Sequence, residues 1–154
     1  MPAQYEPHGR FEISRKDDLV LLDIYGPWNA ELIKEAADRA WPLILDVQKT
    51  GPVGVVVSAR ESMLGTIEAI RTVRLETERH GKQNQMAVAW VAAPEVEGRS
   101  MMPALLQEAY DGVVVFEAFE DSASALGWIR ARLDAWRKAP ADLSTPSASP
   151  RGPS

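Results

Sequence analysis

Three short, almost wholly apolar runs constrain the fold of this chain more than any other feature. They lie at residues 54–58, 86–91 and 113–116, and a segment long enough for a helix follows each of them. A half-buried strand alternates apolar and polar residues, whereas a strand that is apolar throughout is usually buried on both faces. Helices that connect parallel strands provide this double cover. The three runs therefore predict a parallel sheet coated by helices.

Two further strands are predicted before these runs. Residues 11–14 and 19–25 form a hairpin pattern around the polar turn at 15–18. Pro27 ends the second strand, because proline has no N–H group to donate to the sheet. The element order is therefore β-β-α-β-α-β-α-β-α. We predict the α/β class, with a single mixed sheet of about five strands covered by about four helices and an antiparallel strand at one edge.

The helices carry their own signals. Asn29 is the predicted N-cap of the first helix, and Pro42 is predicted to kink or interrupt it. The second helix is predicted over residues 66–80, with Ile67 and Leu75 among its inward-facing residues.

Length and composition predict one domain and limit its partners. Of the 154 residues, 45% are apolar, and we divide the chain into an N-terminal extension (1–8), a domain (9–138) and a disordered Pro/Ser-rich tail (139–154). The net charge of -5 argues against nucleic-acid binding, which needs clustered Lys and Arg. No secretory signal and no apolar run of about 18 residues occurs, so we expect a cytoplasmic protein without stable membrane insertion.

The sequence lacks the signatures of catalysis and of metal binding. No cysteine is present, which excludes thiol nucleophiles and thiolate ligands. Glu95 and Glu97 are interpreted as a solvated rim. Glu76 and His80 have a chelating spacing but no third ligand. No Gly-rich phosphate loop or nucleophile elbow occurs. We therefore predict a non-enzymatic protein without a cofactor or metal.

The order of elements, the length and the stretch GVVVSARESMLGTIEA at 54–69 resemble the STAS domain, in particular its SpoIIAA-like bacterial branch. The turn GPWN at 26–29 and the segment 113–128 add to this likeness, which covers residues 9–137. The resemblance implies a regulatory module that binds a partner protein. In such modules, phosphorylation of a hydroxyl where the third strand meets the next helix controls the binding.

The resemblance places this switch at Thr66. The family signature Asp-Ser-Ser-Gly falls on residues 64–67, where the hydroxyl of Thr66 is kept but the acidic residue and the final glycine are lost. A helix N-terminus suits a phosphate, but threonine is also a common helix N-cap. Both interpretations stay open. Ser62 and Ser58 are the weaker candidates, in a loop and at a strand end.

An alternative function follows from the same branch, which also resembles lipid-carrying domains. It implies a pocket between sheet and helices for a lipid-like apolar small molecule, with transient membrane contact. Methionine and tryptophan suit adaptable apolar sites, but both are also good core residues. A symmetric homodimer through the edge strand and the Trp-bearing helices is a further hypothesis. The residues considered for ligand or partner binding are Trp28, Asn29, Trp41, Met63, Met101 and Met102.

Overall fold

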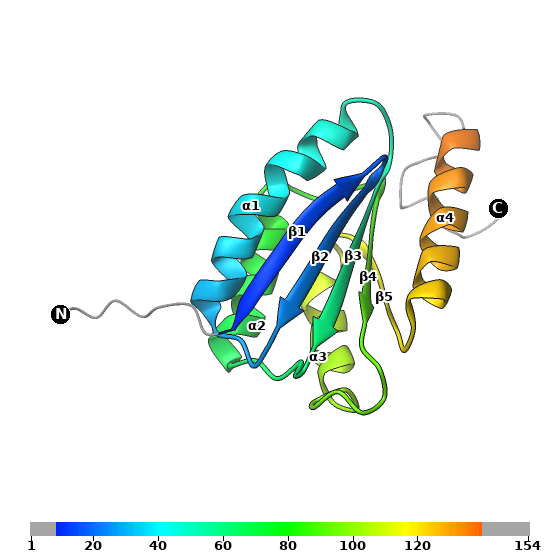
Figure 1. Cartoon of the computed structure of the whole chain (residues 1–154). Helices are drawn as coiled ribbons and strands as arrows, with labels where there is room; N and C mark the ends of the chain where they lie inside the picture. Colours follow the sequence, from blue (N-terminus) through cyan, green and yellow to red (C-terminus); the bar gives the residue numbers. More distant parts are fainter. Residues whose placement is uncertain (1–8, 140–154) are drawn as a thin grey trace.

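The structure, a computed structural model, describes residues 9–139, so the predicted extension at 1–8 and the tail from residue 140 lie outside it. One five-stranded sheet of order β1-β2-β3-β4-β5 forms the centre, and helices lie on both of its faces (Figure 1). The elements are β1 (Arg10–Lys16), β2 (Leu19–Tyr25), α1 (Ala30–Gln48), β3 (Val53–Arg60), α2 (Ile67–Glu78), β4 (Met86–Val91), α3 (Met102–Tyr110), β5 (Val115–Phe119) and α4 (Ser122–Lys138). The predicted α/β class, element order and mixed sheet are confirmed.

The strand directions follow from the connections. β1 pairs antiparallel with β2 through a tight turn, whereas β2, β3, β4 and β5 are mutually parallel and are joined by helices. β3 and β4 are buried on both faces, as their apolar composition predicts.

The third apolar run forms a strand only in its second half. β5 begins at Val115 instead of Val113 and forms an edge of the sheet. Val113 and Val114 are buried in the connection from α3, where the Val113 carbonyl accepts a hydrogen bond from the Gln83 backbone N–H at 2.9 Å. An apolar run can therefore be buried against a sheet without being part of a strand.

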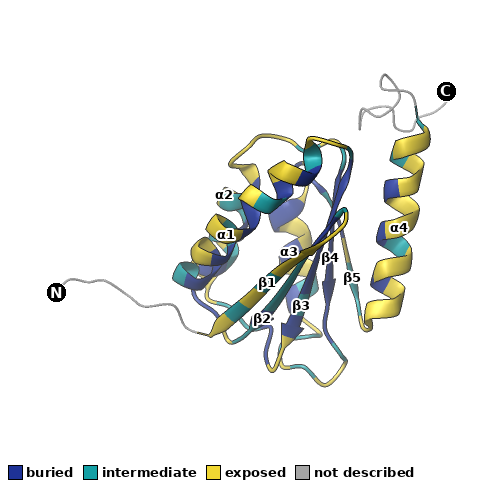
Figure 2. Cartoon of the chain, turned by 45° about the horizontal axis from the view of Figure 1, so that its top comes forward, coloured by how far each residue is buried: buried dark blue, intermediate teal, exposed yellow. Residues whose placement is uncertain are grey.

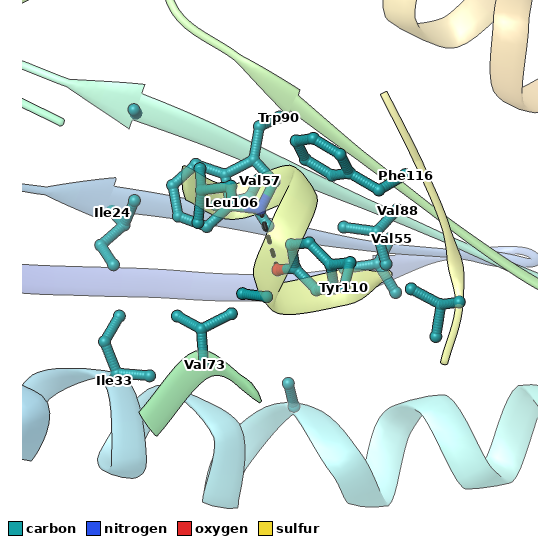
Figure 3. Close-up of a cluster of buried hydrophobic side chains, with 14 of the residues drawn as sticks. Ile24, Ile33, Val55, Val57, Val73, Val88, Trp90, Leu106, Tyr110 and Phe116 are labelled. Atoms are coloured by element: carbon teal, nitrogen blue, oxygen red, sulfur yellow. Dashed lines mark hydrogen bonds between the residues drawn. The ribbon is translucent and has the colours of Figure 1, made fainter. Parts of the chain in front are cut away.

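Three helices cover one face of the sheet and one helix covers the other (Figures 1 and 2). Right-handed crossovers that advance in one direction along a sheet put their helices on the same face, here α1, α2 and α3. The larger hydrophobic cluster lies under these helices and includes the hydrogen bond from Trp90 Nε1 to Tyr110 Oη, at 2.9 Å (Figure 3). α4 packs on the opposite face against β3, β4 and β5 through the fully buried Ile129 and Leu133.

Two details of the helices differ from the sequence-based expectation. α1 continues through Pro42, so the predicted interruption does not occur. Pro42 has no N–H group to donate to the carbonyl of Asp38, four residues earlier in the helix. Both residues are exposed, so water can donate a hydrogen bond to that carbonyl instead. In α2 the side chains of Ile67 and Leu75 are 68% and 65% exposed, so their predicted burial is wrong.

The inner face of α2 consists of smaller residues, Ala69, Val73 and Thr77. This helix packs between α1 and α3. Small side chains allow such close packing, which explains why the largest apolar residues of α2 are not the buried ones.

Candidate functional site

Two loops meet at the carboxyl edge of the parallel strands and form an open surface hollow of 260 Å³. One loop leads from β2 into α1 and the other from β3 into α2. The Trp28 backbone N–H donates to the Leu64 carbonyl at 3.0 Å, and the Thr66 N–H donates to the Trp28 carbonyl at 3.3 Å. We call this feature the Trp28–Thr66 hollow; its lining residues are Pro27, Trp28, Asn29, Leu64, Gly65 and Thr66.

Two helices begin at this hollow, and each is capped by a predicted site residue. Asn29 Oδ1 accepts a hydrogen bond from the Leu32 N–H at 3.0 Å, and Thr66 Oγ1 accepts one from the Ala69 N–H at 3.0 Å. The N-cap interpretation of both residues is therefore confirmed. The positive ends of the α1 and α2 dipoles lie at the same edge of the sheet, where Glu31 and Glu68 in the first helical turns offset part of their positive potential.

The three predicted hydroxyls differ in accessibility. Thr66 is exposed at the hollow. Ser62 is only 3% exposed, and its Oγ accepts a hydrogen bond from the Leu64 N–H at 3.1 Å. Ser58 is half-buried in β3 and does not line the hollow. Of these three residues, Thr66 alone is both exposed and part of the lining of the hollow.

Trp28 forms the buried floor of the hollow. It is 1% exposed, and its ring centroid lies 5.7 Å from that of Trp90. The ring presses on Gly65: a Cβ atom at that position would lie 2.3 Å from Trp28 Cζ3, where no real Cβ fits. The sequence did not indicate Gly65 as a site residue, although Gly65 lies within the aligned signature at 64–67. Its missing side chain lets the α2 loop approach the tryptophan.

The remaining candidates do not form a common site with these residues. Trp41, Met63 and Met102 are core residues, each at most 5% exposed. Trp41 Nε1 donates to the Glu76 carbonyl at 2.9 Å, which ties α1 to α2. Met101 is 54% exposed just before α3.

A small apolar cavity lies between the sheet, α1 and α2, with Trp41, Tyr110 and Val57 in its wall. Its volume is 100 Å³. An engineered cavity of about 150 Å³ holds one benzene molecule, so this one is too small for an acyl chain. The cavity gives the lipid-carrier alternative no support.

A groove of 310 Å³ on the opposite face of the sheet was not anticipated from the sequence. It lies between β2, β3 and α4, and Ser58 is the predicted site residue that lines it. Arg60 crosses from β3 to β2 here, with its Nη2 atom 2.9 Å from Asp23 Oδ1. This face depends on where α4 docks, which no sequence motif indicates.

Two absences hold for the part of the chain that the structure describes. Residues 9–139 contain no cluster of acidic and histidine side chains placed to hold a metal ion. Within the same range, no helix has the length and apolar character needed to cross a membrane.

No family model, no curated protein and no solved structure matches this chain. The fold by itself defines an α/β protein with one mixed sheet between two unequal helical layers.

Proposed function

We propose that this protein is a non-enzymatic regulatory module of the STAS type, acting in the cytoplasm. It binds a partner protein through the Trp28–Thr66 hollow and the first turn of α2. The observation that supports this most is the exposure of Thr66 beside Ile67, whose side chain is 68% exposed. Pro27 and Leu64 in the hollow add apolar surface next to these residues. Apolar surface with a polar rim is typical of protein interaction sites.

Phosphorylation of Thr66 would change this surface without requiring a change of fold. A phosphate adds about −1.5 to −2 charges, and its oxygens can accept hydrogen bonds from the N–H groups of the first turn of α2. The same charge beside Ile67 opposes an apolar contact, because the partner would have to desolvate it. The modified form therefore keeps α2 folded and releases the partner.

The test compares capture of binding proteins by the wild type and by four variants, quantified by mass spectrometry. Thr66→Ala removes the hydroxyl and costs about 1 kcal/mol of helix capping, so it is expected to fold and to bind. Thr66→Glu and Ile67→Asp are expected to lose the same captured protein. Leu75→Asp is the matched control, because Leu75 is 65% exposed on the same helix but lies two turns from the hollow.

The pattern across the variants decides the outcome. Equal capture by the wild type, Thr66→Glu and Ile67→Asp would remove the hollow from the mechanism. Equal loss in Ile67→Asp and Leu75→Asp would show a general effect of charge on α2 instead of a local site. A homodimer through the edge strand and the Trp-bearing helices stays a separate prediction, and a light-scattering mass equal to the 17.0 kDa of one chain would contradict it.

A further inference from the structure

The face of the sheet under α4 is only partly covered. α4 packs against β3, β4 and β5, and the groove of 310 Å³ lies along its flank, over β2 and β3. We call it the α4 groove and define it by an apolar centre and three cationic side chains. The centre is made by Leu21, Val56 and Leu126, and the cations are Lys16, Arg60 and Arg130.

The strand register shows how these residues are arranged along the groove. Leu21 and Val56 are neighbours across β2 and β3, so they lie at the same level of the sheet. Lys16 pairs with Leu19, two residues before Leu21, whereas Arg60 lies four residues after Val56. The apolar centre therefore lies between Lys16 at one end and the Arg60–Asp23 ion pair at the other.

Arg130 belongs to the Lys16 end. Its Nη1 donates to Asp18 Oδ1 at 2.8 Å, and Asp18 directly precedes Leu19 in the turn between β1 and β2. At the other end, Ser58 and Ser122 line the groove together with Arg60.

The charge of the groove is opposite to that of the protein as a whole. The chain carries a net charge of -5, but the groove is lined by three cations and by Asp23 as its acidic group. Arg60 pairs with Asp23 and Arg130 pairs with Asp18. Within residues 9–139 the Lys16 ammonium forms no ion pair, so its charge is available to a ligand.

We infer that the α4 groove binds a small organic anion with an apolar body. The acidic group lies at Lys16 and Arg130, and the body covers Leu21, Val56 and Leu126. The volume of 310 Å³ corresponds to the lower end of small-molecule sites, about 300–1,000 Å³. A stable protein partner would instead bury about 800 Å² of the surface of this chain, so a groove of this small volume favours a small ligand. The groove lies on β2, β3 and α4, away from the Trp28–Thr66 hollow, so the two proposals are independent.

The probe is octanoate, with 1-octanol and acetate as matched controls that keep only the apolar body or only the charge. Binding is measured by titration calorimetry and by amide shift changes in the NMR spectrum of the full chain. Octanoate is expected to bind saturably and to shift the amide signals of Leu21 and Val56. Octanol is expected to bind more weakly, and acetate is expected not to saturate.

Two variants and two controls locate the site. Lys16→Gln should weaken octanoate binding by about twofold to fivefold, the range for a solvent-exposed charge pair. Leu126→Asp should weaken it by more than about tenfold, because it puts a negative charge in the apolar centre. The controls Lys34→Gln on α1 and Leu105→Asp on α3 should leave binding unchanged. Leu105 and Leu126 are 38% and 37% exposed, so the two aspartate substitutions perturb comparable surfaces.

Three results would overturn the inference. The first is an absence of saturable octanoate binding at millimolar concentration. The second is octanol binding as tightly as octanoate, which would show that the cations contribute nothing. The third is a set of shifts confined to the small cavity under α1 and α2. Should Leu126→Asp unfold the protein, the Lys16→Gln titration and the shift map still decide between these results.

Discussion

Replacing Asp18 with asparagine tests how α4 is held on the sheet. The Asp18 carboxylate accepts hydrogen bonds from Arg130 at 2.8 Å and from Arg137, and its side chain is 16% exposed. Burial acts to raise the pKa of Asp18, but the hydrogen bonds and positive charges of Arg137 and Arg130 outweigh burial and lower that pKa. The carboxylate is therefore stabilised in its charged form by the docked helix.

The magnitude follows from the exposure of the partners. An exposed ion pair contributes about 0.2–1 kcal/mol to the free energy of unfolding. Arg130 and Arg137 are 45% and 42% exposed, but the acid they share is largely covered, which favours the upper half of that range. Two such pairs give an expected loss of about 1–2 kcal/mol for Asp18→Asn.

Urea denaturation of the wild type, Asp18→Asn and the control Asp134→Asn measures this loss. Asp134 pairs with the same Arg137 at 3.5 Å but is 62% exposed, so its replacement should cost less than about 0.5 kcal/mol. Because the pKa of Asp18 is lowered by folding, its contribution is present above the ordinary carboxyl value of about 4. It is lost as the pH falls through the lowered value in the folded state.

The difference between wild type and Asp18→Asn should therefore be largest near neutral pH and vanish in strong acid. It should also shrink in about 1 M salt, where charges are screened over about 3 Å. Equal stability of Asp18→Asn and Asp134→Asn at neutral pH would refute the role of the Asp18 ion pairs in holding α4 on the sheet. A difference that persists in strong acid would refute its electrostatic origin.

Three core substitutions and one surface control, Leu126→Ala, give the remaining predictions. Gly54→Ala would place a Cβ 2.7 Å from Ile129 Cγ2, so calorimetry should show a loss of about 1–3 kcal/mol; an unchanged melting temperature would contradict this contact. Ile129→Ala should cost about 2–5 kcal/mol in urea unfolding, and Leu126→Ala much less; equal losses would mean that the inner face of α4 is misassigned. Burial raises the pKa of Tyr110 to about 12, against the opposing hydrogen bond from Trp90, so an ultraviolet titration should show one tyrosine that ionises only near that pH. Tyr110→Phe should remove this step and lower the free energy of unfolding by about 1–3 kcal/mol, because the Trp90 N–H loses its acceptor. The contribution of the neutral Tyr110 phenol to stability is full below the ordinary tyrosine pKa of about 10 and is lost as the pH rises through the raised pKa of the folded state.

β3 and β4 could be predicted from the sequence because burial on both faces leaves a continuous apolar run. The run at 113–116 shows the limit of this signal. Val113 and Val114 are buried in a connection, and the actual edge strand β5 carries the exposed Glu117. A strand at an edge needs less apolar surface, so composition alone does not place its ends.

The orientation of α2 could not be predicted because hydropathy ranks Ile67 and Leu75 above Ala69 and Thr77. The packing of α2 between two other helices selects small residues for its inner face. A hydrophobic pattern indicates how apolar each residue is, but it does not indicate how closely the α2 backbone approaches the backbones of α1 and α3.

The sequence predicts site residues in both loops of the hollow, but it does not predict that these loops are adjacent. Trp28 and Asn29 follow β2, and Thr66 follows β3. They meet because β2 and β3 are adjacent and parallel and end at the same level, with Tyr25 opposite Arg60. Strand order and register are long-range properties that a local motif does not contain.

The α4 groove follows from the number of elements on each face. A helix with its side chains is about 10–12 Å wide, and adjacent strands are about 4.8 Å apart, so one helix covers about two or three strands. Three crossover helices close one face of the five-stranded sheet, but α4 alone cannot close the other. The side chains of β1 on that open face are polar, Arg10, Glu12, Ser14 and Lys16, while Leu21 next to them lies toward α4. A ligand with both characters is best stabilised at a boundary between a polar open surface and a shielded apolar one, and this chain has such a boundary because α4 covers only part of its five-stranded sheet.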